Sequence, residues 1–340
     1  LLVCLLALAG LIFSGSLLPR AESYGEEEVS YTNLLFQSSD TALQHPSRGQ
    51  RQLSHVPDKR LLLPPYFTLI DLEAKSEDDF NCTVTNTAPS FPICVYPTQQ
   101  DIYISAALLS SGVWEPYMTR VYQVALKKHP AAAVIDIGAN VGYYSLMAGT
   151  MGHTVIAVEP SLENVKRLKR GAQLSGLVDK IVLLKNALAK THRNLTLSVN
   201  SVNQGGIQVL EEGDCREGET TRTIVLNDLL HVLTADTAIV KIDIEGYECR
   251  GMETSLKFFR AIKVPYIFME WQQMYKRRHK GAPCPASVMR RMTNFLTNLG
   301  YIAHEVWTSI QLNPHRSTTT WQIGDVYWRH RDQPLLTQPL

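Results

Sequence analysis

Residues 134–145 read VIDIGANVGYYS, and this stretch decides the fold. The short apolar run over residues 133–137 predicts a buried strand, and the apolar spacing over residues 143–151 predicts a helix. Between them, Gly138 opens a turn of small residues, where glycine allows unusual backbone angles and the close approach of a ligand. The stretch therefore predicts the strand, turn and helix with which a ligand-binding α/β sheet begins.

The alternation of strands and helices continues downstream of this turn. Further strands are predicted over residues 154–158, 181–184, 238–242 and 266–269, with 301–306 and 325–328 closing the sheet. Helices are predicted over residues 162–174, 248–259 and 288–299. Continuous apolar strands separated by helices are typical of a parallel sheet covered on both faces. We therefore predict an α/β fold with a mostly parallel sheet flanked by helices.

The chain before this region has a different character. Residues 101–129 predict an amphipathic helix that is broken at Gly112 and Pro116. Residues 61–100 are rich in Pro, Asp and Asn and predict loops with one short strand. From the N-terminus onward we expect a signal-anchor or signal peptide (1–19), a flexible stem (20–60), an N-terminal extension and helical lead-in (61–130), the α/β domain (131–330) and a tail (331–340).

The N-terminal run LLVCLLALAGLIFSGSLL, residues 1–18, contains no charged residue. A run of about 20 apolar residues spans a bilayer, whereas the core of a signal peptide is shorter. We favour a membrane anchor slightly over a cleaved signal, and either one places the remaining chain in the secretory pathway. The triplets that begin at Asn81 and Asn194 fit the N-glycosylation pattern and agree with this location.

Six cysteines are present, without a CxxC pair or a zinc-like spacing. Cys82 and Cys94 flank a short loop and are expected to form a disulfide in an oxidising compartment. Cys249 is expected in a buried helix, and a bond between Cys215 and Cys284 is left open. The 33 basic and 32 acidic residues give a formal net charge of +1, so no nucleic-acid partner is expected.

An acid at the end of the second predicted strand completes a nucleoside-binding pattern. Glu159 follows the Gly138 turn at about the distance at which an acid accepts hydrogen bonds from ribose hydroxyls. The turn itself reads GANVG, so Asn140 replaces the middle glycine that a dinucleotide-binding turn requires. Asp136 enters the same turn, and its negative charge favours a cationic ligand such as S-adenosylmethionine over a pyrophosphate.

Charged residues also end the later strands. Lys241, Asp243 and Glu245 alternate and are expected to project from one face of a strand end, and Glu270 ends the next strand. Such a row lies where α/β sheets bind ligands, so these four residues are the candidate catalytic set. The alternative is a salt-bridged structural cluster. Carboxylates of this kind also suit Mg²⁺, but no ligand spacing demands a metal and none is expected.

These motifs resemble the FkbM family of class I methyltransferases. The resemblance is carried by the GANVG turn, Glu159-Pro160, residues 112–115, 223–230 and 268–270, and above all KIDIEGYE at 241–248. The resemblance spans roughly residues 100–310 and implies a Rossmann-like fold that binds S-adenosyl-L-methionine. The residues that it implies as cofactor contacts are Asp136, Gly138, Asn140, Gly142, Glu159 and, beside the adenine, Asn186.

The family resemblance implies methyl transfer, commonly to a hydroxyl oxygen. Combined with the N-terminus, it predicts O-methylation of a glycan or another small-molecule acceptor, by a single-pass membrane protein with a lumenal catalytic domain or by a secreted enzyme. Two alternatives remain: a lumenal Rossmann oxidoreductase that uses a dinucleotide, and a non-catalytic secreted binding protein that retains the fold. The basic run at 276–280 and the aromatic residues Trp114, Tyr117, Trp271 and Tyr275 are candidates for acceptor binding or for ordinary surface and core roles.

Overall fold

The computed structural model describes residues 63–75, 78–200, 203–209 and 218–336. The predicted anchor, the predicted stem, Cys4 and Cys215 lie outside the described residues. In this part of the chain, no helix combines the length and the apolar character that crossing a membrane requires.

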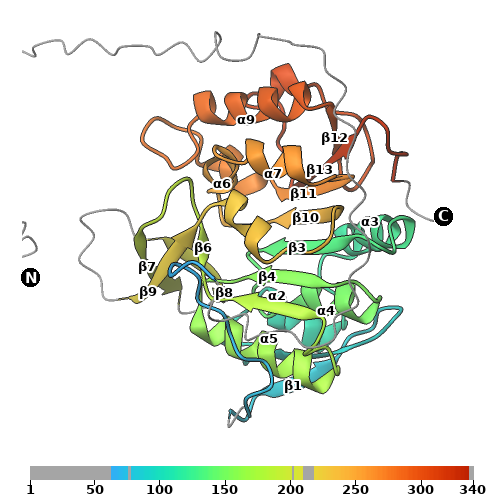
Figure 1. Ribbon diagram of the computed structural model, residues 1–340, viewed down its shortest axis with the longest axis vertical. Helices are drawn as coiled ribbons and strands as arrows, with labels where there is room; N and C mark the ends of the chain where they lie inside the picture. Colours follow the sequence, from blue (N-terminus) through green and yellow to red (C-terminus); the bar gives the residue numbers. More distant parts are fainter. Residues whose placement is uncertain (1–62, 76–77, 201–202, 210–217, 337–340) are drawn as a thin grey trace, which may run out of the picture. The chain divides into compact units, whose positions relative to one another are not determined.

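A central sheet organises the described residues and contains seven strands in the order β12-β13-β11-β10-β3-β4-β5 (Figure 1). The strands are β3 (Ala133–Ile137), β4 (Val155–Val158), β5 (Ile181–Leu184), β10 (Ala238–Ile242), β11 (Tyr266–Glu270), β12 (Tyr301–Glu305) and β13 (Asp325–His330). Strands β5, β4, β3, β10 and β11 are parallel, and β13 is antiparallel to both of its neighbours. The predicted α/β fold with a mostly parallel sheet is therefore confirmed.

Strand β3 lies between β4 and β10, so the chain changes direction across the sheet at this strand. Ligands of open α/β sheets bind at such a switch point, beyond the carboxyl ends of the strands. The turn that follows β3 and the acid that follows β4 meet at this place, as do the charged residues of β10.

Helices cover both faces of the sheet, because alternate strand residues point to opposite sides. Val134 faces the core formed with α3 (Pro116–Lys128), α4 (Tyr143–Thr150) and α5 (Leu162–Leu174). Ile135 faces the second core, formed with α6 (Glu248–Met252), α7 (Leu256–Ala261) and α9 (Ala286–Asn298). The remaining helical segments are α2 (Ile104–Ser110), α8 (Gln272–Lys276), η3 (Leu226–His231) and η4 (Pro314–Arg316).

The prediction of a single helix over residues 248–259 is wrong, because α6 and α7 are separate helices. The Ser255 hydroxyl donates to the Met252 carbonyl at 2.6 Å. The Asn227 Oδ1 atom accepts the backbone N–H of Phe258 at 2.8 Å. Side chains thus take up backbone groups that a continuous helix would use, and the chain bends between the two helices. The break predicted before α3 is confirmed, since Pro116 is the first residue of that helix.

A smaller four-stranded sheet, not predicted from the sequence, lies beside the central sheet in the described residues (Figure 1). Its order is β6-β9-β7-β8, with β6 (Ala187–Leu188), β7 (Asn194–Asn200), β8 (Asn203–Val209) and β9 (Glu219–Ile224). Strands of this kind carry a weak sequence signal, since β9 reads ETTRTI and buries only part of its length. The sheet is inserted between β5 and β10 and supplies one wall of the site described below.

Two disulfides are present among the described cysteines. The predicted Cys82–Cys94 bond is confirmed, and it joins β1 (Asn81–Val84) to β2 (Pro92–Val95) at directly opposite positions. The suggested Cys215–Cys284 pair is wrong, because Cys284 is bonded to Cys249. That second bond links α6 to the loop before α9, two segments that are far apart in the sequence but adjacent in the fold.

Candidate active site

The turn after β3 is held tightly between two neighbouring strands. Backbone N–H groups of Gly138 and Ala139 donate to the Val158 carbonyl at 2.9 and 3.1 Å. Gly138 has a φ of 79°, and a Cβ at this position would overlap the carbonyl oxygen of Asp243. Glycine is therefore required both by the backbone angle and by the close approach of the β10 end.

Glu159 follows β4 and is only 3% exposed. Its Oε2 atom accepts the backbone N–H of Asn140 at 2.8 Å. Its Oε1 atom accepts the backbone N–H of Ser161 at 2.9 Å and the Asn164 amide at 3.1 Å. Burial raises the pKa of Glu159 to about 7, although these hydrogen bonds favour the charged form. The side chain lines the cavity described below while it also fixes the Gly138 turn.

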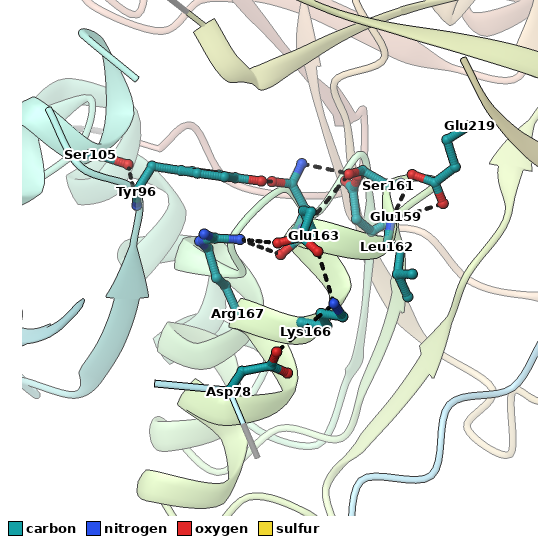
Figure 2. Close-up of polar contacts among 11 residues, drawn as sticks. Asp78, Tyr96, Ser105, Glu159, Ser161, Leu162, Glu163, Lys166, Arg167 and Glu219 are labelled. Atoms are coloured by element: carbon teal, nitrogen blue, oxygen red, sulfur yellow. Dashed lines mark hydrogen bonds and ion pairs between the residues drawn. The ribbon is translucent and has the colours of Figure 1, made fainter. Parts of the chain in front are cut away.

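A chain of polar contacts supports Glu159 from behind, as Figure 2 shows. The Tyr96 hydroxyl donates to Asn164 Oδ1 at 2.8 Å, and Asn164 in turn holds Glu159. The Arg167 guanidinium lies 3.5 Å from the centre of the Tyr96 ring and pairs with Glu163. Tyr96 follows β2, so the disulfide-bonded hairpin β1–β2 helps to position the acid beside the turn.

A cavity of about 810 Å³ opens above the carboxyl ends of the strands. Its volume is in the range of small-molecule sites. One side is formed by the turn and by Glu159, and the other by the ends of β10 and β11. The remaining wall comes from the inserted sheet and from residues 281–283.

Lys241 and Asp243 form an ion pair in the wall of this cavity, with Lys241 buried and Asp243 partly exposed. Lys241 is 4% exposed, and its Nζ atom lies 3.0 Å from Asp243 Oδ2 and 4.7 Å from the centre of the Tyr144 ring. Burial lowers the pKa of Lys241, but the carboxylates of Asp243, Asp136 and Glu115 outweigh burial and raise the pKa above its ordinary value. The ammonium is therefore a fixed positive charge next to the ligand space.

A second pair, Glu115 and Tyr144, also lies near the positive charge of Lys241. The Tyr144 hydroxyl donates to Glu115 Oε2 at 2.6 Å, and both residues line the cavity. Burial raises the pKa of Glu115, and the positive charge of Lys241 opposes this shift. In the sequence, Glu115 stands out only as part of a family pattern, because nothing there brings α3 to the end of β10.

The far end of the site is rich in carboxylates. Glu270 ends β11 opposite Asp325 of β13. Burial raises the pKa of Glu270 to about 11, and the neighbouring Asp243 and Glu248 carboxylates add to the shift. Burial also raises the pKa of Glu248 to about 8. Neither Glu248 nor Asp325 is among the predicted site residues, although Glu248 lies within the KIDIEGYE segment; the position of Asp325 depends on strand pairing.

Glu245 reaches the cavity in a different way from that predicted. Strand β10 ends at Ile242, and Glu245 occupies a turn with a φ of 56°. The turn forms because Glu248 Oε1 accepts the backbone N–H groups of Ile244 and Gly246 at 2.8 and 3.2 Å. Glu245 therefore does not continue an alternating strand row, but its side chain still lines the cavity.

Of the expected cofactor contacts, Gly138, Asn140, Glu159 and Asn186 line the cavity, whereas Asp136 and Gly142 do not. Asp136 is buried, and its Oδ2 atom accepts the Ser145 hydroxyl at 2.6 Å. Gly142 caps the start of α4 and packs closely against Leu168. Asp136 and Gly142 therefore support the turn after β3 from outside the cavity lining.

The side-chain amide of Asn186 is engaged away from the cavity. Its Oδ1 atom accepts the backbone N–H of Thr68 at 3.0 Å. Its Nδ2 atom donates to the carbonyls of Tyr66 and Arg222 at 2.9 and 3.1 Å. Asn186 therefore links the segment around Tyr66 and Thr68 to the inserted sheet. Asn186 still lines the cavity, but its side-chain amide is already hydrogen-bonded to these backbone groups.

The candidate acceptor-binding residues also separate into two groups. Trp271 is fully buried against Trp321, and Tyr275 donates its hydroxyl to the Thr319 carbonyl. Trp114 lines the cavity and is the aromatic candidate with access to a ligand there. In the basic run, Arg277 donates to the Glu245 carbonyl at 3.0 Å, so part of that run holds the turn after β10.

The chain matches one family model and is similar to several solved structures. A family model, the methyltransferase FkbM domain, matches residues 136–303. No curated protein sequence matches the chain. Among solved structures, an O-methyltransferase from Bacillus cereus, in complex with SAH, is similar at 11% identity and a TM-score of 0.39, covering 66% of this chain and 86% of that one.

Two further solved structures have comparable similarity. The O-methyltransferase TomG from Streptomyces achromogenes, in complex with SAM, is 10% identical with a TM-score of 0.38, covering 64% of this chain and 81% of that one. A putative O-methyltransferase from Klebsiella pneumoniae is 12% identical with a TM-score of 0.36, covering 68% and 97%. The family match contains the turn, Glu159 and the ends of β10 and β11, and through residues 136–303 the chain belongs to the FkbM family of class I S-adenosylmethionine-dependent methyltransferases.

Proposed function

We propose that this methyltransferase acts on a hydroxyl oxygen of a glycan or another small-molecule acceptor. The observation that carries the proposal is the Lys241–Asp243 ion pair in the wall of the ligand cavity, in which Lys241 is buried and Asp243 is partly exposed. A hydroxyl group has a high pKa, so its methylation requires a group that takes the proton and a charge that stabilises the oxygen. The ion pair offers both in one place.

The residues of the turn fit S-adenosylmethionine. Glu159 lines the cavity as an acceptor for ribose hydroxyls. Gly138 lines the cavity without a side chain, and its lack of a Cβ lets the turn pack against the Asp243 carbonyl. The Asp243 carboxylate, which follows β10 in the cavity wall, suits the positive charge of the cofactor's ammonium group. When it is bound, the cofactor supplies an electrophilic methyl group.

The residues of the chain then act on the acceptor. Lys241 remains charged and stabilises negative charge on the acceptor oxygen as the new O–C bond forms. The acceptor proton passes to a carboxylate of the wall, either the Asp243 oxygen not bonded to Lys241 or Glu115. Glu245 and Glu270 line the same space. Trp114 offers an apolar surface to the acceptor.

A secretory location is part of this proposal. Two disulfides among the described residues agree with an oxidising compartment. Asn81 and Asn194, which begin the two glycosylation triplets, are exposed. We propose that residues 1–18 anchor the protein or direct its secretion, with the methyltransferase domain in the lumen, and that nucleic acids are not its acceptors.

Membership of the methyltransferase family overturns the alternative of a dinucleotide-dependent oxidoreductase. A binding protein without turnover is distinguished by experiment. The purified full chain is incubated with methyl-labelled S-adenosylmethionine and separate fractions of glycans, lipids, small molecules, proteins and nucleic acids. We expect label on oxygen in a glycan or small-molecule fraction, and less label with Lys241→Met. Label on nitrogen or sulfur, or on nucleic acid, would contradict the proposed acceptor, and cofactor binding without any transfer would support the binding protein.

A further inference from the structure

A cluster of three carboxylates lies where β10 and β11 end and α6 begins. One carboxylate oxygen from each of Asp243, Glu248 and Glu270 lies within 4.8 Å of the other two. Asp243 and Glu270 line the cavity, and Glu248 is fully buried behind them. The spacing has the dimensions of an ion, because opposite ligands of Mg²⁺ lie about 4.2 Å apart and those of Ca²⁺ about 4.8 Å apart.

The buried member of the cluster has one oxygen that no group in the described structure satisfies. Glu248 is 0% exposed, and its Oε1 atom is held by the backbone N–H groups of Ile244 and Gly246. Its Oε2 atom is buried without a hydrogen-bond partner among the described residues. Because Oε1 is committed to the turn, Oε2 is the oxygen available to the cluster. A buried carboxylate oxygen without a donor is costly, and a bound cation would remove that cost.

Asp243 and Glu270, the other two members of the cluster, each also have one carboxylate oxygen that is available to a ligand. Asp243 Oδ2 is bonded to Lys241, which leaves Oδ1 available. Glu270 Oε2 is buried and has no hydrogen-bond partner in the described part of the chain. Nearby cations are already engaged, Lys241 with Asp243 and Arg277 with the Glu245 carbonyl. These cations are therefore engaged with groups other than the Oε2 atoms of Glu248 and Glu270.

We propose that Asp243, Glu248 and Glu270 bind one divalent cation of the oxygen-preferring class, Mg²⁺, Mn²⁺ or Ca²⁺. The donor set consists of carboxylates and contains no histidine or thiolate, which favours these ions over zinc. Three protein ligands leave coordination positions open toward the cavity. The site lies at the ends of β10 and β11, beside residues 281–283 of the cavity wall, and is separated from the ribose acid by the turn.

The cation gives the proposed function a more specific form, and this inference rests on that function. A divalent ion at the cavity wall binds the acceptor hydroxyl directly and lowers its pKa. Acceptors with two adjacent oxygens, such as vicinal diols of sugars, are favoured because they occupy two open positions. Lys241 then stabilises the same oxygen from the other side, and Glu115, outside the cation cluster, takes the proton.

The test uses the full chain and Mn²⁺ as the probe, with free ion measured by electron paramagnetic resonance in the absence of cofactor. We expect one saturable site, displaced by Mg²⁺ or Ca²⁺, and an affinity reduced by at least about tenfold in Glu248→Gln and Glu270→Gln. Glu248→Gln keeps a side-chain oxygen that accepts the backbone N–H groups of Ile244 and Gly246, so the turn after β10 is retained. Glu163→Gln, which removes a half-exposed carboxylate on α5, is the matched control and should bind Mn²⁺ normally.

Cofactor binding and labelled methyl transfer are measured on the same samples with and without EDTA. Loss of transfer in EDTA with cofactor binding retained supports the cation site. If wild type shows no saturable Mn²⁺ binding, or both variants bind as tightly as wild type, the cation proposal is overturned. Transfer that continues in EDTA overturns it as well while leaving the proposed function intact, whereas the proposed function itself fails if no hydroxyl acceptor is methylated under any metal condition.

Discussion

Glu159 Oε2 accepts a hydrogen bond of 2.8 Å from the backbone N–H of Asn140, so the acid after β4 holds the turn after β3. Glu159→Ala removes this bond and the two bonds made by Oε1. We expect S-adenosylmethionine affinity to fall by about tenfold or more, because a charge-assisted bond contributes about 1.5–3 kcal/mol. The unfolding free energy should fall by a similar amount, and the domain should remain folded. Calorimetric titration and thermal unfolding measure the two effects.

Two comparisons separate the roles of Glu159. Tyr96→Phe removes the hydroxyl that donates to Asn164 but keeps the Glu159 carboxylate. We therefore expect only a small loss of cofactor affinity in this variant. Glu73→Gln changes an exposed carboxylate outside this chain of contacts and should leave affinity unchanged. Normal cofactor affinity in folded Glu159→Ala would show that this acid does not contact the ligand.

The pKa of about 7 at Glu159 predicts a pH dependence with opposite signs for binding and for stability. A carboxylate accepts ribose hydrogen bonds better than a carboxylic acid, so cofactor affinity should rise by roughly fivefold to tenfold between pH 6 and pH 8. The folded chain holds a proton on Glu159 between about pH 4.5 and 7 that the unfolded chain releases. This group's contribution to stability is therefore present at low pH and is lost as the pH rises toward 7.

Titrations of cofactor affinity at several pH values check the first part, and denaturant unfolding at the same values checks the second. The comparison is with Glu159→Gln, which does not titrate. Glu245, whose pKa burial also raises to about 7, remains in both proteins and cancels in the difference. Identical pH profiles for wild type and Glu159→Gln would assign the dependence to another group.

Gly138→Ala is predicted to disrupt the site more than its backbone angle alone explains. Gly138 has a φ of 79°, and a new Cβ would overlap the Asp243 carbonyl oxygen. Gly176 has a similar φ of 63°, but a methyl group added there would meet nothing within 4 Å, so Gly176→Ala isolates the cost of the angle. We expect Gly176→Ala to lower the unfolding free energy by about 1–2 kcal/mol. Gly138→Ala should lower it further and abolish cofactor binding, as thermal unfolding and titration would show; equal effects would mean that the close approach is unimportant.

The parts of the fold that the sequence predicts well are those with a local signal. Buried strands such as β3 and β10 are short runs of mainly apolar residues, and Pro116 marks the start of α3. The inserted sheet carries no such signal, because strands such as β9 consist mainly of polar residues and depend on pairing with each other. The split between α6 and α7 depends on Asn227, which is distant in the sequence.

The candidate site shows the same division. The motif residues Gly138, Glu159, Lys241 and Asp243 can be identified from the sequence because each lies at or just beyond the end of a predicted strand. Glu115 reaches the site only because α3 packs near β10, and Asp325 only because β13 pairs with β11. For Asp136, the sequence places an acid at the turn but does not show that its side chain points to Ser145.

The two disulfides are predicted to have different consequences for activity. The Cys249–Cys284 bond joins α6 to the loop that supplies residues 281–283 of the cavity wall. The Cys82–Cys94 bond joins two neighbouring strands outside the cavity wall. In the chain-entropy account, each bond stabilises the fold by about 3–4 kcal/mol. Serine replacement of both members of either pair should therefore lower the unfolding temperature.

Only the Cys249→Ser/Cys284→Ser double variant should also raise the KM for the acceptor, because it releases part of the wall. Its cofactor affinity should stay near that of wild type. Peptide mapping without reduction first checks that the pairs are those of the structure, and steady-state kinetics then compares the two double variants. An equal effect of both pairs on acceptor KM would indicate a general loss of stability.

The charged pair at the end of β10 is predicted to govern turnover more than cofactor binding. Lys241→Met removes the fixed positive charge and preserves much of the length of the side chain. We expect kcat to fall by about 10²-fold or more, since the acceptor oxygen loses its stabilising charge. The unfolding free energy should fall by about 3 kcal/mol, because Asp243, Asp136 and Glu115 lose their shared partner. Lys241→Arg keeps the charge and should recover part of the rate and of the stability.

Asp243→Asn tests the other half of the pair. It keeps the shape and the contact with Lys241 but removes the negative charge, so the rate should fall even where cofactor still binds. If Asp243 also holds the methionine ammonium, the cofactor dissociation constant rises together with the loss of kcat, and the ratio of the two effects separates the roles. Lys166→Met, in a half-exposed ion pair on α5, is the control for the loss of a lysine charge and should leave both constants unchanged. Methylation at the wild-type rate by both Lys241→Met and Asp243→Asn would show that the catalytic centre lies elsewhere in the cavity.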